Sequence, residues 1–226
     1  MFDFFNEKNA CVFDLDGTLL DTVNDIADAT NAVLRFYGKA PQKLDFFERV
    51  VGTGVEKNLK MMFSDNGDIF LNDVMDRFDT EYRKHMFSNT SPYPDILNML
   101  KDLNNKGVSL GILSNKRACY VDDLVNYFFK DIEFSSVLGL SENVPAKPSK
   151  VFSQKILDEM DIRAQDCLYI GDTVTDIKTA LNIGMKPVGV TWGYGDVAQM
   201  KDNGALMMLS YAKELTFEYG AIQQGV

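Results

Sequence analysis

The chain has 226 residues, of which 46% are hydrophobic and 25% charged, a mixture that can bury a core and is typical of globular proteins. Its formal net charge of -10 argues against nucleic acids and anionic membranes as partners, because both select a clustered basic face. No apolar run approaches the roughly 18 residues that span a bilayer, and residues 1–8 lack the basic start of a signal peptide, so we expect a cytoplasmic protein.

The first part of the chain predicts one buried strand followed by helices. Residues 10–13 are apolar and lead into the charged sequence Asp-Leu-Asp-Gly-Thr at 14–18. Apolar residues then recur at helical spacing from Thr22 to Tyr37, and Gly38 ends that helix. Between about 41 and 88 the pattern is helical without a convincing strand, and its last helix is expected at 69–86.

Beyond the proline-rich turn at 91–94, strands and helices alternate. The expected helices cover 96–103, 120–129, 151–160 and 174–181, and the expected strands cover 108–113, 134–138, 167–170, 187–190 and 205–209. Strands separated by helices predict an α/β fold, a Rossmann-like parallel sheet with helices on both faces. We therefore expect an α/β core domain, residues 1–19 and 91–226, and an inserted all-helical cap domain, residues 20–90.

Two carboxylates follow the first strand. Alternate side chains of an extended segment face the same way, so Asp14 and Asp16 should project together from the strand end. Ligands of open parallel sheets bind at that edge. Gly17 permits a tight turn, and Thr18 adds a hydroxyl donor. An isolated Asp-x-Asp would suggest only a solvated loop, but its place between a strand and a helix favours a catalytic pair.

Three further polar motifs follow the later strands. Ser114 and Asn115 come directly after the second core strand, where a hydroxyl and an amide can hold phosphate. Lys147 precedes a helix and can offer a point charge to phosphoryl oxygens. Asp172 and Asp176 follow the strand at 167–170 and can face one cation, for which oxygen ligands favour magnesium. Asp176 has an alternative interpretation, as a partner of the dipole at a helix N-terminus.

In order and spacing, these motifs resemble the four motifs of haloacid dehalogenase superfamily hydrolases, over essentially the whole chain. The resemblance implies that Asp14 is a nucleophile that forms an aspartyl-phosphate. It also implies that Asp16 is the general acid that protonates the leaving oxygen, and later the base that activates water.

The same resemblance implies two sets of ligand-binding residues. The phosphate would be bound by Thr18, Ser114, Asn115 and Lys147. A Mg²⁺ cofactor would be bound by Asp14, Asp172 and the backbone carbonyl of Asp16, with Asp176 acting through water or behind the direct ligands.

Three shorter patterns narrow the resemblance to phosphoglycolate phosphatases and their pyrophosphatase relatives. They are Leu-Ser-Asn-Lys at 113–116, Val-Gly-Thr-Gly at 51–54 and Gly-Val-Thr-Trp-Gly-Tyr-Gly at 189–195. The implied activity is hydrolysis of a small phosphate monoester, with 2-phosphoglycolate as the best candidate. An inorganic pyrophosphatase, a β-phosphoglucomutase-like phosphoryl transferase and a catalytically silent phosphate-binding protein are the alternatives. The expected partner is a small phosphorylated metabolite, and the chain could be a monomer or a homodimer.

Residues in the expected cap could choose the substrate. Gly52, Thr53 and Gly54 open a helix, so their amides could bind a second anionic group, although a plain turn explains them equally well. Arg49 beside them could reach the far end of the substrate, or could lie on a solvated helix face.

Overall fold

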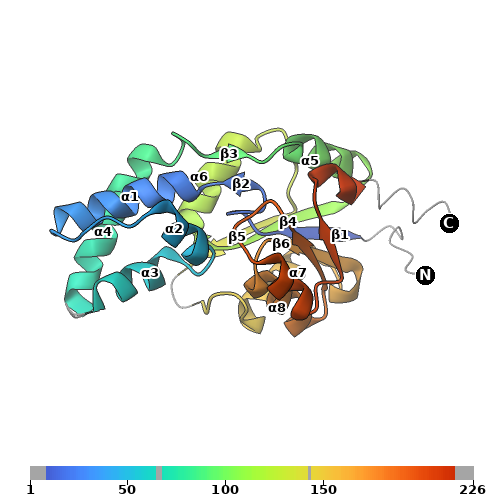
Figure 1. Cartoon of the computed structure of the whole chain (residues 1–226). Helices are drawn as coiled ribbons and strands as arrows, with labels where there is room; N and C mark the ends of the chain where they lie inside the picture. The colour runs from blue at the N-terminus through green and yellow to red at the C-terminus, as the bar shows by residue number, and fades with distance from the viewer. Residues whose placement is uncertain (1–8, 65–67, 142–143, 217–226) are drawn as a thin grey trace.

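The computed structural model describes residues 9–64, 68–141 and 144–216 of the chain. Its centre is a six-stranded sheet in the order β5-β4-β1-β6-β7-β8, with all neighbouring strands parallel (Figure 1). The strands are β1 (Ala10–Phe13), β4 (Ser109–Arg117), β5 (Ser136–Leu140), β6 (Cys167–Gly171), β7 (Lys186–Val190) and β8 (Met207–Leu209). The expected α/β fold is thus confirmed, while residues 1–8 and 217–226 of the expected core lie outside the described residues.

Helices cover both faces of this sheet. They are α5 (Ile96–Asn105), α6 (Ala118–Phe128), α7 (Lys150–Met160), α8 (Val174–Ile183) and α9 (Val197–Asp202). Along β1, Cys11 and Phe13 belong to the apolar cluster that contains residues of α5 and α6, whereas Ala10 and Val12 belong to the cluster that contains residues of α7 and α8. A strand that is covered on both faces needs apolar residues at every position, and β1 has them.

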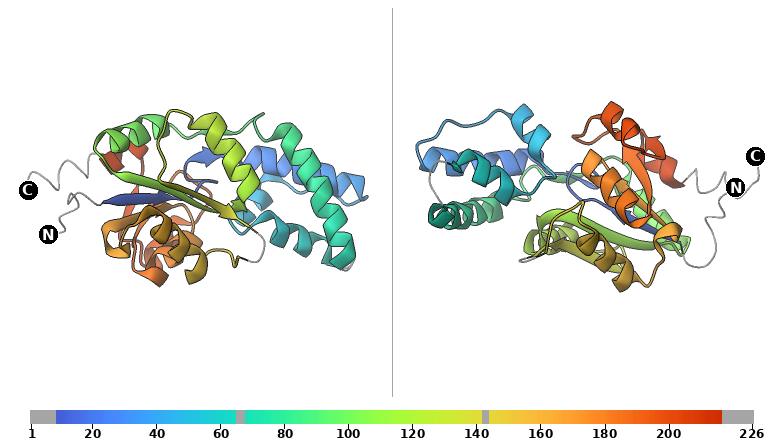
Figure 2. Two further views of the ribbon diagram at one scale, coloured as in Figure 1. Left: turned by 180° about the vertical axis from the view of Figure 1, so that it is seen from behind. Right: turned by 90° about the horizontal axis from the view of Figure 1, so that it is seen from below.

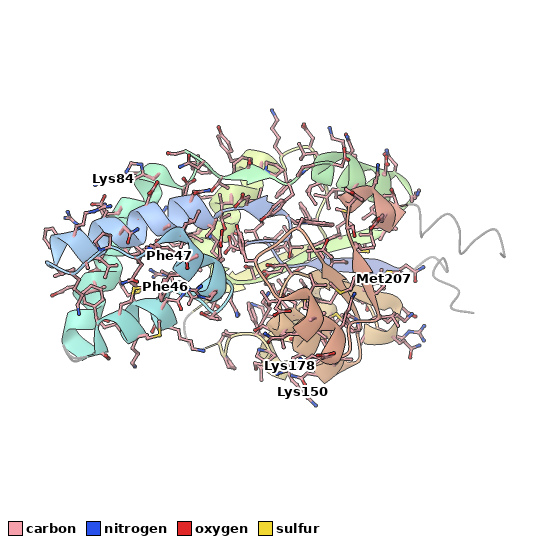
Figure 3. All side chains as sticks on the ribbon, viewed as in Figure 1. Phe46, Phe47, Lys84, Lys150, Lys178 and Met207 are labelled. Carbon is pink, nitrogen blue, oxygen red and sulfur yellow. The ribbon has the colours of Figure 1, made fainter. Side chains whose placement is uncertain are left out.

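Four helices form a separate group at one end of the molecule (Figure 2). They are α1 (Val23–Phe36), α2 (Leu44–Val50), α3 (Val55–Met62) and α4 (Asp68–His85). The long helices α1 and α4 pack against each other. Phe47 of α2, labelled in Figure 3, is buried against Val23 and Ala27 of α1. These helices match the helical pattern of the sequence, and the division of the chain into a core and a cap domain stays a prediction.

A small two-stranded ribbon joins the two ends of this helical group. Strands β2 (Leu20–Asp21) and β3 (Ser91–Pro92) pair antiparallel, with Leu20 opposite Pro92. The sequence does not predict them, because two residues are too few to show the alternation of a strand. The ribbon brings the chain into and out of the helical group at neighbouring points.

One strand differs from its expected length in a way that matters for the site. β4 runs to Arg117 instead of ending at residue 113, so Ser114, Asn115 and Lys116 continue the strand. Its register with β5 shifts between Leu113 and Arg117. Among the described residues, no helix combines the length and the apolar character needed to cross a membrane.

Candidate active site

The sheet order brings the separate sequence motifs together at one edge. β4, β1 and β6 are neighbours and parallel, so their carboxyl ends lie side by side. Asp14 and Asp172 directly follow β1 and β6, and Ser114 lies near the end of β4. The Asp14 backbone N–H donates to the Ile170 carbonyl at 2.9 Å, which fixes Asp14 against β6.

Two glycines leave room for the side chains of Asp172 and Asp176 at this edge of the sheet. Gly17 has φ of 81°, in the left-handed region, and a Cβ atom there would collide with the Asp172 carboxylate. A Cβ atom at Gly171 would collide with the Asp176 side chain. Larger residues at either position would therefore push these carboxylates apart.

Asp14, Asp172 and Asp176 form a buried carboxylate cluster in which one oxygen of each lies within 4.8 Å of the others. Burial raises the pKa of Asp14 to about 7, with Lys147 opposing the rise and Asp176 adding to it. Burial, followed by the charges of Asp176 and Asp14, raises the pKa of Asp172 well above its usual value. Carboxylates packed in this way are stable in their charged form only with cations beside them.

Lys147 supplies one of those cations. Its ammonium lies 3.0 Å from Asp14 Oδ1 and 2.8 Å from Asp176 Oδ1, and it donates to the Tyr169 hydroxyl at 3.0 Å. Burial lowers the pKa of Lys147, but the charges of Asp14 and Asp176 outweigh that effect and hold the pKa well above its usual value. One ammonium cannot balance three carboxylates, so the cluster still favours a bound cation.

Asp176 has two structural connections. Its Oδ2 accepts from the Thr173 N–H at 3.0 Å and from the Thr173 hydroxyl at 2.7 Å, which caps α8. Its Oδ1 accepts from Lys147. Asp176 therefore both caps the first turn of α8 and lies in the carboxylate cluster, and its part in holding a cation stays a prediction.

Thr18 and Tyr194 orient Asp172. The Thr18 hydroxyl donates to Asp172 Oδ1 at 3.0 Å, and the Tyr194 backbone N–H donates to Oδ2 at 2.9 Å. Thr18 thus contacts the cluster directly, and its expected contact with a phosphate stays a prediction.

Asp16 has different partners from Asp14, although only one residue separates them. The Lys116 ammonium lies 2.9 Å from Asp16 Oδ1 and 3.1 Å from Oδ2, and the Thr22 hydroxyl donates to Oδ1 at 2.7 Å. Asp16 is buried and is not part of the carboxylate cluster. The two carboxylates therefore lie in distinct surroundings, as distinct chemical roles require.

Asn115 links the phosphate motifs to the helical group. Its side-chain oxygen accepts from the Lys147 backbone N–H at 2.8 Å, and its amide nitrogen donates to the Gly52 carbonyl at 2.9 Å. Ser114 is buried beside it, where its hydroxyl oxygen accepts from the Lys116 N–H at 3.3 Å. Both lie at the expected edge of the sheet, and their contact with phosphate stays a prediction.

The four residues that we expect to determine substrate specificity lie in different surroundings. Gly52 and Gly54 line a cavity that also contains Asp16. The Thr53 N–H donates to the Val50 carbonyl at 3.2 Å, so this amide is already used in the turn. Arg49 pairs with Asp45, four residues before it, and its side chain is 67% exposed. The substrate contacts of all four residues stay predictions.

This cavity has a volume of about 40 Å³ and lies between the helical group and the ends of β1 and β4. Its walls are formed by Asp16, Ile26, Val51, Gly52, Gly54, Val55, Asn58, Phe78, Tyr82, Asn115, Lys116 and Tyr120. Three residues beside Asp16 are not expected from the sequence to belong to the site, namely Lys116, Tyr82 and Thr22. Lys116 alone had a visible signal, since it directly follows Ser114 and Asn115 in the sequence.

Comparisons with known proteins find a matching family and several similar proteins. The family model described as haloacid dehalogenase-like hydrolase matches residues 11–190. A phosphoglycolate phosphatase of Psychrobacter arcticus is 31% identical over 210 residues, which cover 88% of this chain and 91% of that protein. One from Neisseria gonorrhoeae is 31% identical over 199 residues, with 86% and 84% covered. The crystal structure of a candidate phosphoglycolate phosphatase from Lactobacillus delbrueckii subsp. bulgaricus superimposes with a TM-score of 0.83 at 27% identity, covering 92% of this chain and 96% of that one.

Proposed function

The chain belongs to the haloacid dehalogenase-like hydrolases and is a phosphoric monoester hydrolase, and we propose that it hydrolyses a small carboxylated ester, best represented by 2-phosphoglycolate, with Mg²⁺ as cofactor. The observation that carries the proposal is that Asp14 and Asp16 lie beside each other in different surroundings. Asp14 lies in a buried carboxylate cluster with Lys147, and Asp16 lies beside it facing a small cavity. The names of the relatives support the choice of ester.

The carboxylate cluster fits a magnesium ion. All its donors are oxygens, they are buried within 4.8 Å of one another, and a single lysine opposes their charge. Asp14, Asp172 and the backbone carbonyl of Asp16 would hold the ion, with Asp176 behind them. The ion would offset the repulsion between the phosphate and the carboxylates and polarise a phosphoryl oxygen.

Asp14 carries out the first chemical step. Both of its described contacts, from the Leu15 N–H at 2.7 Å and from Lys147, fall on Oδ1. One carboxylate oxygen attacks phosphorus, the bond between phosphorus and the ester oxygen breaks, and the phosphoryl group is carried by Asp14. Lys147, Thr18 and Ser114 stabilise the charge of the phosphoryl oxygens.

Asp16 moves the protons of both steps. It donates a proton to the departing ester oxygen and then removes a proton from the water that attacks the aspartyl-phosphate, which releases phosphate and restores Asp14. Lys116 and Thr22 hold its carboxylate in place.

The cavity beside Asp16 supports a small leaving group. A volume of about 40 Å³ holds only a few water-sized groups, since one water needs about 10–15 Å³ on this measure. A two-carbon acid matches this space better than a sugar ring does.

The proposal is tested by phosphate release from 2-phosphoglycolate, pyrophosphate, β-glucose 1-phosphate and propyl phosphate, each with Mg²⁺ and with excess chelator. We expect the highest kcat/KM for 2-phosphoglycolate, at least about tenfold above propyl phosphate, because the second charge adds one ionic contact. Chelator should abolish all turnover. Preference for pyrophosphate, conversion of the sugar phosphate to an isomer, or binding without turnover would each point to one of the alternative functions.

A further inference from the structure

The small cavity beside Asp16 contains a single cation. Lys116 is the only lysine or arginine among its lining residues, which all belong to the described part of the chain. Its side chain is 6% exposed. Lys150 and Lys178, by contrast, are exposed on α7 and α8 (Figure 3). A buried ammonium in the wall of a cavity has an electrostatic effect that a surface lysine lacks.

The charge of Lys116 is maintained despite its burial. Burial lowers the pKa of Lys116, but the charge of Asp16 outweighs that effect and raises the pKa above its usual value. The ammonium also lies 4.9 Å from the centre of the Tyr82 ring. The contacts with both Asp16 oxygens, at 2.9 and 3.1 Å, fix this ammonium in the cavity wall.

Tyr82 brings a second polar group to the neighbourhood of Lys116. Its side chain is 1% exposed, and its hydroxyl interacts with the Lys116 ammonium but makes no hydrogen bond of normal geometry within the described residues. Its ring packs on Phe78 and on the edge of Tyr120, which fixes its position. A buried hydroxyl without a well-formed hydrogen bond calls for an explanation, and a bound ion or polar ligand is one.

We propose that Lys116 and Tyr82 form the subsite that binds the substrate's carboxylate and thereby select carboxylated phosphate monoesters. The inference rests on the proposed function, because it assigns a binding site to one part of that substrate. It also moves the ionic contact from Arg49, which is exposed and paired with Asp45, to a buried residue in the cavity wall.

The position of Lys116 suits the covalent structure of such an ester. Asp16 must contact the ester oxygen in order to protonate it, and Lys116 contacts Asp16. In 2-phosphoglycolate a single methylene separates the ester oxygen from the carboxylate. When the carboxylate points from the ester oxygen into the cavity, it therefore comes within reach of the Lys116 ammonium. The Tyr82 hydroxyl can then donate a second hydrogen bond to the same carboxylate.

The competing role for Lys116 is to position Asp16 and nothing more. In that case its removal would slow all esters equally. We therefore compare 2-phosphoglycolate with 2-hydroxyethyl phosphate, which has the same length and a neutral end, in wild type, Lys116→Met and Tyr82→Phe. Lys155→Met is the matched control, since Lys155 is exposed on α7, where it pairs with Glu159 at 3.8 Å.

The preference for the carboxylated ester is the kcat/KM for 2-phosphoglycolate divided by that for 2-hydroxyethyl phosphate. Lys116→Met should lower this ratio by about 30-fold, because a buried ionic contact is lost. The loss of preference should fall mainly on KM. Tyr82→Phe should lower the ratio by about tenfold. It should change the unfolding temperature of the free protein little, because the hydroxyl makes no hydrogen bond of normal geometry there. Lys155→Met should leave the ratio unchanged.

Two contrary results distinguish a failure of the proposed subsite from a failure of the proposed substrate. If wild type prefers 2-phosphoglycolate and both cavity variants keep that preference, the subsite is wrong and the proposed substrate stands. If wild type hydrolyses both esters without preference, the proposed substrate and the subsite both fail. The Tyr82→Phe variant keeps the test decisive if Lys116→Met does not fold.

Discussion

Asp16 is held by two donors that come from separate parts of the chain. Lys116 reaches it from β4, and Thr22 reaches it from the start of α1. Neither donor contacts Asp14, whose partners are Lys147 and the Leu15 N–H. In the mechanism that we propose, this separation gives each carboxylate one task, attack on phosphorus for Asp14 and proton transfer for Asp16.

Replacement of Asp16, the proton donor that we propose, should affect substrates according to their leaving groups. Asp16→Asn should lower kcat by about 10²- to 10⁴-fold for an alkyl phosphate, whose departing oxygen needs a proton. The loss should be much smaller for the first step with 4-nitrophenyl phosphate, whose leaving group departs without a proton. The measurement is the rate of product release in a single turnover. Equal losses for both esters would contradict the assignment of Asp16.

The predicted parallel sheet indicated where Asp14, Asp172 and Ser114 lie, because parallel neighbouring strands bring their carboxyl ends together. It did not predict that Lys116 and Tyr82 line one cavity together. Tyr82 is on α4, and its approach to Lys116 depends on how that helix packs over β4. No local pattern in the sequence contains that information.

Helix α1 is attached to the end of the helical group through one buried carboxylate. Asp25 is fully buried and accepts hydrogen bonds from the backbone and side chains of both Asn89 and Thr90, at 2.8 to 3.1 Å. These residues directly precede β3, so the contact fixes the segment that leads from α4 back to the sheet.

Loss of the Asp25 carboxylate should lower the stability of the protein without removing a group that takes part in the proposed reaction. Asp25→Ala leaves several buried donors unpaired, and we expect the free energy of unfolding to fall by about 3 kcal/mol. Denaturant unfolding measures the change, and Asp28→Ala on the exposed side of the same helix is the control. A change within about 0.5 kcal/mol would show that the Asp25 contacts contribute little.

The elements that the sequence predicted are those long enough to show a period. α1, α7, β1 and β6 were found within a few residues of their observed ends, because apolar residues repeat along them. β2 and β3 were missed because each has two residues. The end of β4 was missed because its last residues are polar, and a polar segment is not recognised as a buried strand.

The protein as a whole is acidic, with a net charge of -10, and it buries three carboxylates in one cluster. For Asp14 the pKa rises from 3.8 to about 7 on folding, first because of burial. A carboxyl group with a raised pKa in the folded state stabilises the protein at low pH, and that stabilisation is lost as the pH rises from about 4 through about 7. The raised pKa of Asp172 acts in the same direction.

Magnesium should therefore stabilise the protein most where the cluster is ionised. Saturating Mg²⁺ should raise the unfolding temperature by about 5 °C or more at pH 8, and by less at pH 6, where protons compete with the ion. Thermal unfolding with Mg²⁺ and with chelator at both pH values gives the comparison. Asp172→Asn should lose the effect. An equal rise at both pH values, or a full rise in Asp172→Asn, would argue against the cluster as the metal site.

The most direct measurement is to trap the phosphoryl group on the enzyme. Rapid quenching during turnover of 2-phosphoglycolate, followed by borohydride reduction, converts an acyl phosphate of aspartate to homoserine, which mass spectrometry locates in the tryptic peptide of residues 9–35. We predict modification at Asp14 alone, and neither modification nor turnover in a folded Asp14→Asn variant. Continued turnover without modification of Asp14, or modification of another residue, would contradict the account.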